Sequence, residues 1–157
     1  MPRPITYTDL MILLRQKMAE NLATVFDCNI IHLARIHNRA GNITVVENQV
    51  NIPFDVKRIY YLYDIPGGES RAAHGHKQLE QLIIAASGSF DISIDDGINK
   101  KTVQLNRPYM GLHVQPGIWR NIANFSSGAI CLVLASMLYT EEDYLREYDE
   151  FKNFRQR

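Results

Sequence analysis

The chain has 157 residues, of which 46% are hydrophobic and 10% aromatic, and its 17 basic residues balance its 17 acidic ones. This composition predicts one domain with a real core and excludes a disordered chain. A neutral chain without a basic run gives no reason to expect nucleic acid, although a few local arginines suffice to bind a small anion.

The first part of the chain predicts a helical extension. Apolar residues recur at three- and four-residue spacing from Thr8 to Phe26, and Thr8 is the expected N-cap. Lys17 and Glu20 interrupt the apolar pattern, so it is not a signal peptide, and no window is long and apolar enough to span a membrane. We therefore expect residues 1–28 to be an N-terminal helical extension of a cytoplasmic protein.

From Asn29 onward the pattern changes to short strands rich in β-branched and aromatic residues, separated by glycine and proline turns. The expected strands cover residues 30–37, 43–47, 56–63, 82–86, 90–94, 102–105, 111–114, 119–125 and 130–136. Turns at this even spacing are typical of an all-β sandwich or barrel. Strands this numerous in so short a chain close most easily as a double-sheet jelly roll, the group that includes cupins.

The tail from Thr140 to Phe154 reads as a C-terminal helix, and Thr140 with Asp143 is expected to form its capping box. The sequence thus predicts an all-β, cupin-type jelly roll over residues 29–157 that includes this helix.

The stretch from Gly68 to Gly88 holds the candidate chemistry. His74 and His76 are two residues apart, so both side chains point to one face of a strand. Glu80 shares that face only if no bulge intervenes. Two imidazoles and a carboxylate facing one interior indicate either a metal site or a proton-transfer site. The alternative is a pair of surface histidines near a hairpin.

Cupin barrels carry two sequence patterns. The first is matched by Gly68, His74, His76 and Glu80, with Gly88 late by one residue. The second is matched, after one deletion, by Gly111, Pro116, Gly117 and Asn124, with Arg120 at its histidine position.

Arg120 decides between a metal site and a metal-free site. A guanidinium offers no lone pair to a metal, and its charge repels a cation. The three remaining ligands could still hold a catalytic metal with open positions. We favour a site with no metal and no cofactor, in which the histidines move protons and Arg120 stabilises negative charge.

Longer runs of sequence carry a specific resemblance. They are residues 58–64 (RIYYLYD), 71–77 (RAAHGHK) with 80–81, 95–97 (DDG), 116–119 (PGIW), 125–127 (FSS), 134–136 and 144–151. From about Ile31 to Phe151 the chain resembles the WxcM-like cupins, and within them the dTDP-4-oxo-6-deoxy-glucose 3,4-ketoisomerases. The helix from Thr8 to Phe26 is a departure, because typical members start near the first strand.

The resemblance implies an isomerase whose substrate is a dTDP-linked 4-oxo-6-deoxy-hexose. It moves the ketone from C4 to C3 through an enediolate and needs no metal. The resemblance also implies that His76 is the base and that His74 shuttles the proton or orients the base. Arg71 suits the diphosphate, since a guanidinium matches phosphate with two hydrogen bonds.

Five further residues are candidates for substrate binding. Tyr61 and Tyr63 alternate along one strand, so both face one side and could line the sugar pocket. Arg120 is expected to bind negative charge, Trp119 could stack on a ring, and His113 is expected near the barrel mouth. For the tyrosines, Trp119 and His113, the alternative is a purely structural role.

The resemblance further implies a homodimer that exchanges an N-terminal strand. Other functions stay open. A 3,5-epimerase would use the same ligand class and the same enolisation but would leave the ketone at C4. A catalytically silent nucleotide-sugar-binding cupin would bind the ligand without changing it. A metal-dependent oxygenase is the third alternative.

Overall fold

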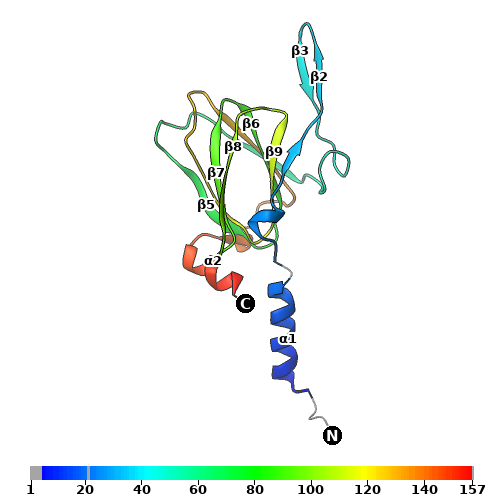
Figure 1. The fold of residues 1–157 in the computed structure, drawn as a ribbon, viewed down its shortest axis with the longest axis vertical. Helices are drawn as coiled ribbons and strands as arrows, with labels where there is room; N and C mark the ends of the chain where they lie inside the picture. Colours follow the sequence, from blue (N-terminus) through cyan, green and yellow to red (C-terminus); the bar gives the residue numbers. More distant parts are fainter. Residues whose placement is uncertain (1–4, 21, 157) are drawn as a thin grey trace.

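Two five-stranded antiparallel sheets face each other and form a barrel, with helix α1 before it and helix α2 after it (Figure 1). The structure is a computed structural model that describes residues 5–20 and 22–156, with residues 14–20 described by their backbone alone. The architecture confirms the prediction of an all-β, cupin-type jelly roll with an N-terminal and a C-terminal helix.

The order of strands in each sheet differs from their order in the chain. The first sheet runs β1 (Ile30–His32), β9 (Met110–Val114), β6 (Gln81–Ser87), β11 (Ile130–Ala135) and β4 (Arg58–Leu62). The second sheet runs β12 (Tyr144–Leu145), β5 (Arg71–His76), β10 (Trp119–Ala123), β7 (Phe90–Asp95) and β8 (Lys100–Leu105). A separate hairpin of β2 (Arg35–Asn38) and β3 (Gly41–Thr44) extends beyond the barrel (Figure 1).

The core lies between the two sheets. On β7, Phe90, Ile92 and Ile94 alternate with less buried residues and have no exposed surface, as expected for a strand with one face in the core. A second apolar cluster, which includes Phe54 and Leu82, lies apart from this core. Strand β6 contributes to both clusters, which explains why its sequence is a continuous apolar run rather than an alternating one.

The N-terminal helix is shorter than predicted. Helix α1 covers Tyr7–Glu20, a 3-10 turn η1 covers Val25–Asp27, and residue 21 of the predicted helix lies outside the described residues. The expected N-cap at Thr8 is wrong, because Thr6 makes the capping contacts. The backbone N–H of Asp9 donates to Thr6 Oγ1 at 3.1 Å, and Thr6 N–H donates to Asp9 Oδ2 at 3.0 Å.

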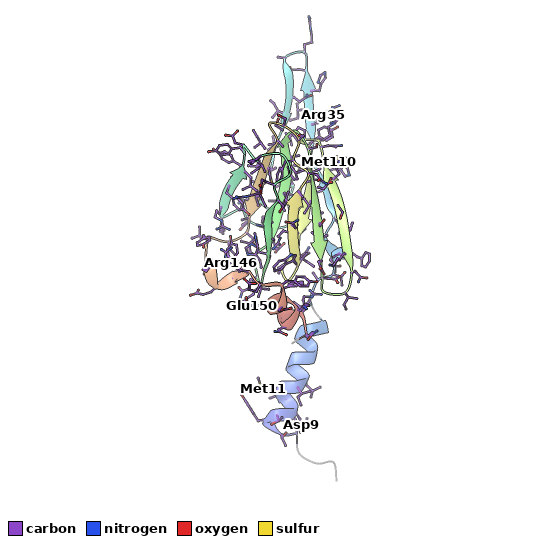
Figure 2. All side chains as sticks on the ribbon, turned by 90° about the vertical axis from the view of Figure 1, so that its left-hand side faces the viewer. Asp9, Met11, Arg35, Met110, Arg146 and Glu150 are labelled. Carbon is purple, nitrogen blue, oxygen red and sulfur yellow. The ribbon has the colours of Figure 1, made fainter. Side chains whose placement is uncertain are left out.

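Helix α1 extends away from the barrel (Figures 1 and 2). Its apolar residues Leu10, Ile12 and Leu13 are each about half exposed, whereas the side chains of Leu14 and Met18 lie outside the described ones. No helix in the described part of the chain is long and apolar enough to cross a membrane.

The predicted helix from Thr140 to Phe154 is in fact three elements. They are the 3-10 turn η2 (Glu141–Asp143), strand β12 and helix α2 (Tyr148–Arg155). Tyr144 and Leu145 are extended because they pair with His76 and Gly75 at the edge of β5. The expected capping box is also wrong, since the side chain of Thr140 makes no cap hydrogen bond.

Candidate active site

A cavity of about 490 Å³ opens into the barrel and is lined from both sheets. Its polar lining comes from Arg58, Tyr60, Ser70, Arg71, His74, Gln81, Arg120, Tyr139, Tyr144 and Arg146. None of the described residues that line it is an aspartate or a glutamate. The cavity is therefore positively charged and suits a negatively charged ligand.

Unpartnered polar atoms gather around this cavity. Among the described residues, the buried side-chain nitrogen and oxygen atoms without a hydrogen-bond partner all belong to Arg58, His74, His76 and Arg120. Each arginine has an unpartnered Nε and Nη2, and each histidine an unpartnered Nε2. Burial of such donors and acceptors is costly, so their concentration in one place indicates a site built for a polar ligand.

The two histidines lie next to each other at the end of β5, as the sequence predicts. Their ring centroids are 4.9 Å apart and their planes are almost perpendicular. His74 lines the cavity, whereas His76 has no exposed surface. The ring of Tyr144, which also lines the cavity, lies 4.3 Å from the ring of His76 and 5.0 Å from that of His74.

The surroundings keep both imidazoles neutral. Burial, with a further contribution from the charge of Arg120, lowers the pKa of His74 to about 4. The same two causes, followed by the neighbouring His74, lower the pKa of His76 below its ordinary value. Neutral imidazoles with a free Nε2 lone pair are able to accept a proton at pH 7.

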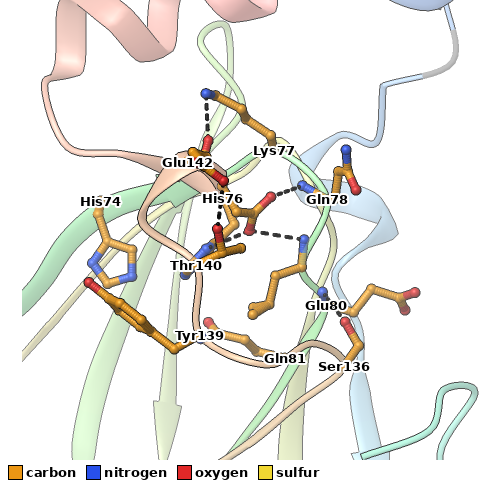
Figure 3. Close-up of polar contacts among 12 residues, drawn as sticks. His74, His76, Lys77, Gln78, Glu80, Gln81, Ser136, Tyr139, Thr140 and Glu142 are labelled. Atoms are coloured by element: carbon orange, nitrogen blue, oxygen red, sulfur yellow. Dashed lines mark hydrogen bonds and ion pairs between the residues drawn. The ribbon is translucent and has the colours of Figure 1, made fainter. Parts of the chain in front are cut away.

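The carboxylate beside the histidines is not the one that the sequence pattern indicates. Asp143 Oδ2 lies 3.0 Å from His76 Nδ1, and Asp143 is itself almost completely buried. Figure 3 draws this contact together with the hydrogen bond from Gln78 N–H to the same carboxylate. Sequence reasoning missed Asp143, because 67 residues separate it from His76 and its neighbours read as a helix start.

Glu80 has a different partner. The chain turns between His76 and β6, so Glu80 leaves the face of the histidines and its Oε2 lies 2.8 Å from His113 Nε2. Phe54 stacks on the imidazole of His113 at 5.6 Å. His113 was expected near the barrel mouth, but it does not line the cavity, and its contacts give it a structural place against the second apolar cluster.

Arg120 enters the cavity from β10. It pairs with His74 across the strands, its side chain is 1% exposed, and its Nη1 donates to the His74 carbonyl at 3.5 Å. Burial lowers the pKa of Arg120 to about 10, so it stays charged at neutral pH. In the described part of the chain, no three His, Cys, Asp or Glu side chains are grouped in a way that could hold a metal ion.

Trp119 lies on the opposite face of β10 from Arg120, because successive side chains of a strand alternate. Its ring packs edge-on against Tyr148 at 5.3 Å and at a tilt of 50° against Phe151 at 5.6 Å, both on α2. Trp119 does not line the cavity, and its contacts are those of a packed barrel aromatic, the alternative to stacking on a substrate ring.

Tyr61 on β4 and Tyr63 just after this strand lie away from the cavity. Tyr61 and Tyr63 share one side as expected, but they are 60% and 59% exposed and line a separate outer groove. The residues of this strand that line the cavity are Arg58, Tyr60 and Leu62. Alternation predicts which residues share a face, but it does not say which face is inward when both carry tyrosines.

Arg58 is the second residue that sequence reasoning missed. Its guanidinium lies over the rings of Tyr60 and Tyr139, at 5.4 and 5.5 Å from their centroids. The sequence contained one indication of its position. Arg58 and Tyr60 are two residues apart on β4, so their side chains lie on the same face of the strand.

Arg71 lies at the mouth of the cavity. It also lines the outer groove with Tyr61 and Tyr63. A bulge separates it from the histidines, because Ala72 and Ala73 have φ values of +75° and +53° and the pairing with β10 shifts by one residue there. The cavity thus has an exposed arginine, Arg71, at its mouth and a buried arginine, Arg120, beside the histidines.

A two-sheet jelly roll with a basic, histidine-bearing cavity defines a cupin-type protein. The profile of the family described as "WxcM-like, C-terminal" matches residues 26–156, and the chain belongs to this family. The match begins close to the predicted boundary after residue 28, which itself stays a prediction.

Characterised relatives are similar over most of the chain. A TDP-4-oxo-6-deoxy-alpha-D-glucose-3,4-oxoisomerase of Aneurinibacillus thermoaerophilus is 40% identical over 125 residues, which cover 80% of this chain and 90% of the relative. A 3,4-ketoisomerase structure from Helicobacter canadensis has a TM-score of 0.81 and 44% identity, and covers 83% of this chain and 98% of its own.

A third relative carries its ligand. It is an H51N variant of the 3,4-ketoisomerase QdtA from Thermoanaerobacterium thermosaccharolyticum in complex with TDP-4-keto-6-deoxyglucose. Its TM-score is 0.80 at 35% identity, and the match covers 82% of this chain and 93% of that one. Close homologues of this chain are therefore TDP-sugar ketoisomerases, which are isomerases.

Proposed function

We propose that this chain is a metal-independent 3,4-ketoisomerase of a dTDP-linked 4-oxo-6-deoxy-hexose. The observation that carries the proposal is the set of unpartnered, buried nitrogens of Arg58, His74, His76 and Arg120 around one cavity. Such a set offers proton acceptors next to fixed positive charge, which is what enolisation beside a ketone requires. The names of the relatives supply the substrate class.

The arginines would bind the substrate at two depths. Arg71, which is exposed at the mouth, is the residue proposed to bind the diphosphate. Arg58 and Arg120 lie beside the histidines and contribute to lowering the pKa of His76, so their charges act where the reaction occurs. Tyr61 and Tyr63 lie next to Arg71 in the outer groove, where they could contact only the nucleotide end of the ligand.

The histidines would move the proton. In the proposed reaction, His76 removes the proton from C3 of the sugar, and the electrons form an enediolate whose negative charge Arg120 stabilises. The C3 hydroxyl then loses its proton and becomes the ketone. C4 and its oxygen each gain a proton, with His74 as the shuttle. The sugar is neither oxidised nor reduced overall, so no cofactor is required.

The position of the ketone in the product tests this proposal. The purified protein is incubated with dTDP-4-oxo-6-deoxy-glucose, and the mixture is then reduced with borodeuteride, which places deuterium at the carbon that bore the ketone. We expect deuterium at C3 in the treated sample and only at C4 in a sample without protein. Deuterium confined to C4 in both samples would contradict ketoisomerisation and would leave epimerisation at C3 and C5, or binding alone, as the function.

We also propose that the chain forms a homodimer with exchange of its N-terminal strand. Support comes from the hairpin β2–β3, which extends beyond the barrel with Ile36 and Ile43 more than half exposed. In the single chain β1 pairs with its own β9, and an exchanged dimer would make this pairing with the partner's β1. Light scattering should give twice the chain mass of 18.0 kDa, and a monomer at micromolar concentration would contradict the proposal. The cytoplasmic location stays a prediction.

A further inference from the structure

Asp143 is held in place from three directions. Its Oδ1 accepts a hydrogen bond from Gln78 N–H at 2.7 Å, and its Oδ2 accepts one from Leu79 N–H at 3.3 Å. The same Oδ2 lies 3.0 Å from Nδ1 of His76. Asp143 is 6% exposed and His76 is fully buried, so water does not compete for these contacts.

The backbone around Asp143 fixes its position further. Lys77 N–H donates to the Asp143 carbonyl at 2.9 Å, and Lys77 Nζ donates to the Glu142 carbonyl at 2.7 Å (Figure 3). The next two residues pair with β5 as strand β12. The backbone that carries the carboxylate is therefore tied to the edge of the second sheet beside His76.

This geometry decides which nitrogen of His76 carries the proton. A carboxylate only accepts hydrogen bonds, so the nitrogen that faces it at 3.0 Å must be Nδ1–H. The opposite tautomer would place two lone pairs against each other in a buried site. With the proton on Nδ1, the unpartnered Nε2 keeps its lone pair and can act as the base.

The carboxylate also matters after the proton has moved. Arg120, His74, Arg58 and Arg146 all disfavour a charged His76 electrostatically, and so does its burial. Asp143 is the carboxylate that contacts the ring, so it is placed to stabilise the imidazolium that forms when His76 takes the proton from C3.

We propose that Asp143 is a positioning residue that holds His76 in the base-competent tautomer and stabilises its protonated form during turnover. The inference rests on the proposed ketoisomerase function, which it deepens. Asp143 itself does not line the cavity and acts through His76.

The variant that tests this role is Asp143→Asn. An asparagine that keeps its oxygen on Gln78 N–H turns its amide NH₂ toward His76 and donates to Nδ1, which forces the proton onto Nε2. We expect kcat to fall at least about 100-fold while the Kd for TDP stays within about threefold. Glu142→Gln is the matched control, because it removes a neighbouring charge on the same turn, and Glu142 contacts Lys77 only through its backbone carbonyl.

A spectroscopic reading separates positioning from a structural role. Long-range ¹H–¹⁵N NMR of the histidine side chains should show His76 as the Nδ1–H tautomer in the unaltered protein and in Glu142→Gln, and as the Nε2–H tautomer in Asp143→Asn. The inference is overturned if His76 is the Nε2–H tautomer in the unaltered protein. This measurement does not depend on whether any variant folds. Retention of at least a third of the kcat by Asp143→Asn also overturns it.

The failures of the two proposals are distinguishable. If the unaltered protein does not move the ketone, the proposed function fails whatever Asp143→Asn does. If the unaltered protein is active and Asp143→Asn is equally active, only the role of Asp143 fails.

Discussion

At the scale of single residues, the site depends on the burial of Arg120 beside two imidazoles. Burial, followed by the charge of this guanidinium, lowers the pKa of both histidines and keeps them neutral, and the Nε and Nη2 of Arg120 are unpartnered. In the proposed reaction the same charge, together with that of Arg58, would stabilise the enediolate. In this proposal, one buried arginine helps to keep the histidines neutral and stabilises the enediolate that they form.

His76→Asn is expected to abolish turnover and to leave nucleotide binding nearly intact. Asparagine fills much of the same space but has no basic nitrogen, so we expect a loss of at least about 1,000-fold in kcat. The Kd for TDP, measured by calorimetry, should change less than about threefold. His32→Asn is the control, because His32 is exposed on β1. Wild-type turnover in His76→Asn would show that another group is the base.

Arg58→Met tests the residue that the sequence patterns did not single out. Methionine keeps an unbranched side chain between Tyr60 and Tyr139 but removes the charge. Loss of a hydrogen-bonded charge typically costs about 1.5–3 kcal/mol, so kcat/KM should fall about 10- to 100-fold. The control is Arg107→Met, since Arg107 is exposed and does not line the cavity. If both variants lose the same activity, Arg58 has no specific role in the site.

The sequence predicted that His74 and His76 share one face of a strand. It also showed Arg120 at the position where metal-binding cupins have a histidine. It did not predict the carboxylate partner of His76, since contacts across 67 residues leave no periodic signal. It also assigned Tyr61 and Tyr63 to the cavity, because strand alternation fixes parity but not direction. The roles of the cavity residues in catalysis stay proposals.

At the scale of elements, β5 carries local strain next to the histidines. Ala72 and Ala73 both adopt positive φ, a region in which a side chain costs about 1–2 kcal/mol per residue. The bulge at this point lets Arg71 reach the mouth of the cavity although the histidines of the same strand lie deeper.

Ala73→Gly should therefore stabilise the protein. Ala73 is exposed, so the substitution removes strain without leaving a cavity, and we expect the free energy of unfolding to rise by about 0.5–1 kcal/mol. Ala86→Gly is the matched control, because Ala86 is also an exposed strand residue but is not among the residues with positive φ. The control should lose about 0.5–1 kcal/mol in the same urea titration. A loss of stability in Ala73→Gly would mean that the bulge is not strained.

The helices were the least predictable elements. The apolar pattern at both ends of the chain has helical spacing. Each predicted helix is interrupted where a tertiary contact outweighs the local preference for a helix. Tyr144 and Leu145 become extended because β5 offers an open edge, and Val25 begins a separate 3-10 turn whose N–H donates to Asp96 at 3.0 Å. Neither contact is visible in a local window of sequence.

At the scale of the whole molecule, the closed two-sheet barrel was predictable and the sheet order was not. Evenly spaced short strands identify a jelly roll, because few other arrangements bury so many strands in so short a chain. Which strands pair depends on long-range contacts, such as β5 between β10 and β12, that composition and periodicity do not encode. The two matching cupin sequence patterns had already indicated a cupin-type arrangement of the strands.

The buried histidines should make stability depend on pH. The pKa of His74 is about 4 in the folded protein and near 6.5 when unfolded. Between about pH 4 and pH 6.5, His74 therefore binds a proton in the unfolded state but not in the folded state. The free energy of unfolding is therefore unaffected by the titration of His74 above about pH 6.5, and it decreases as the pH falls toward 4 and the unfolded state binds the proton. We expect urea unfolding to give a free energy that decreases from pH 7.5 to pH 5, and His74→Asn to flatten that slope. A slope that His74→Asn leaves unchanged would contradict the low pKa.

The measurement that tests the account most directly is proton NMR of dTDP-4-oxo-6-deoxy-glucose with the purified protein in deuterated water, beside the same mixture with His76→Asn. The account predicts that the C3 proton signal disappears with the unaltered protein as the ketone moves to C3, and that it persists with the variant. Exchange at C3 and C5 with the ketone still at C4 would make the protein an epimerase. No exchange at all, with TDP bound, would contradict catalysis and leave a binding protein.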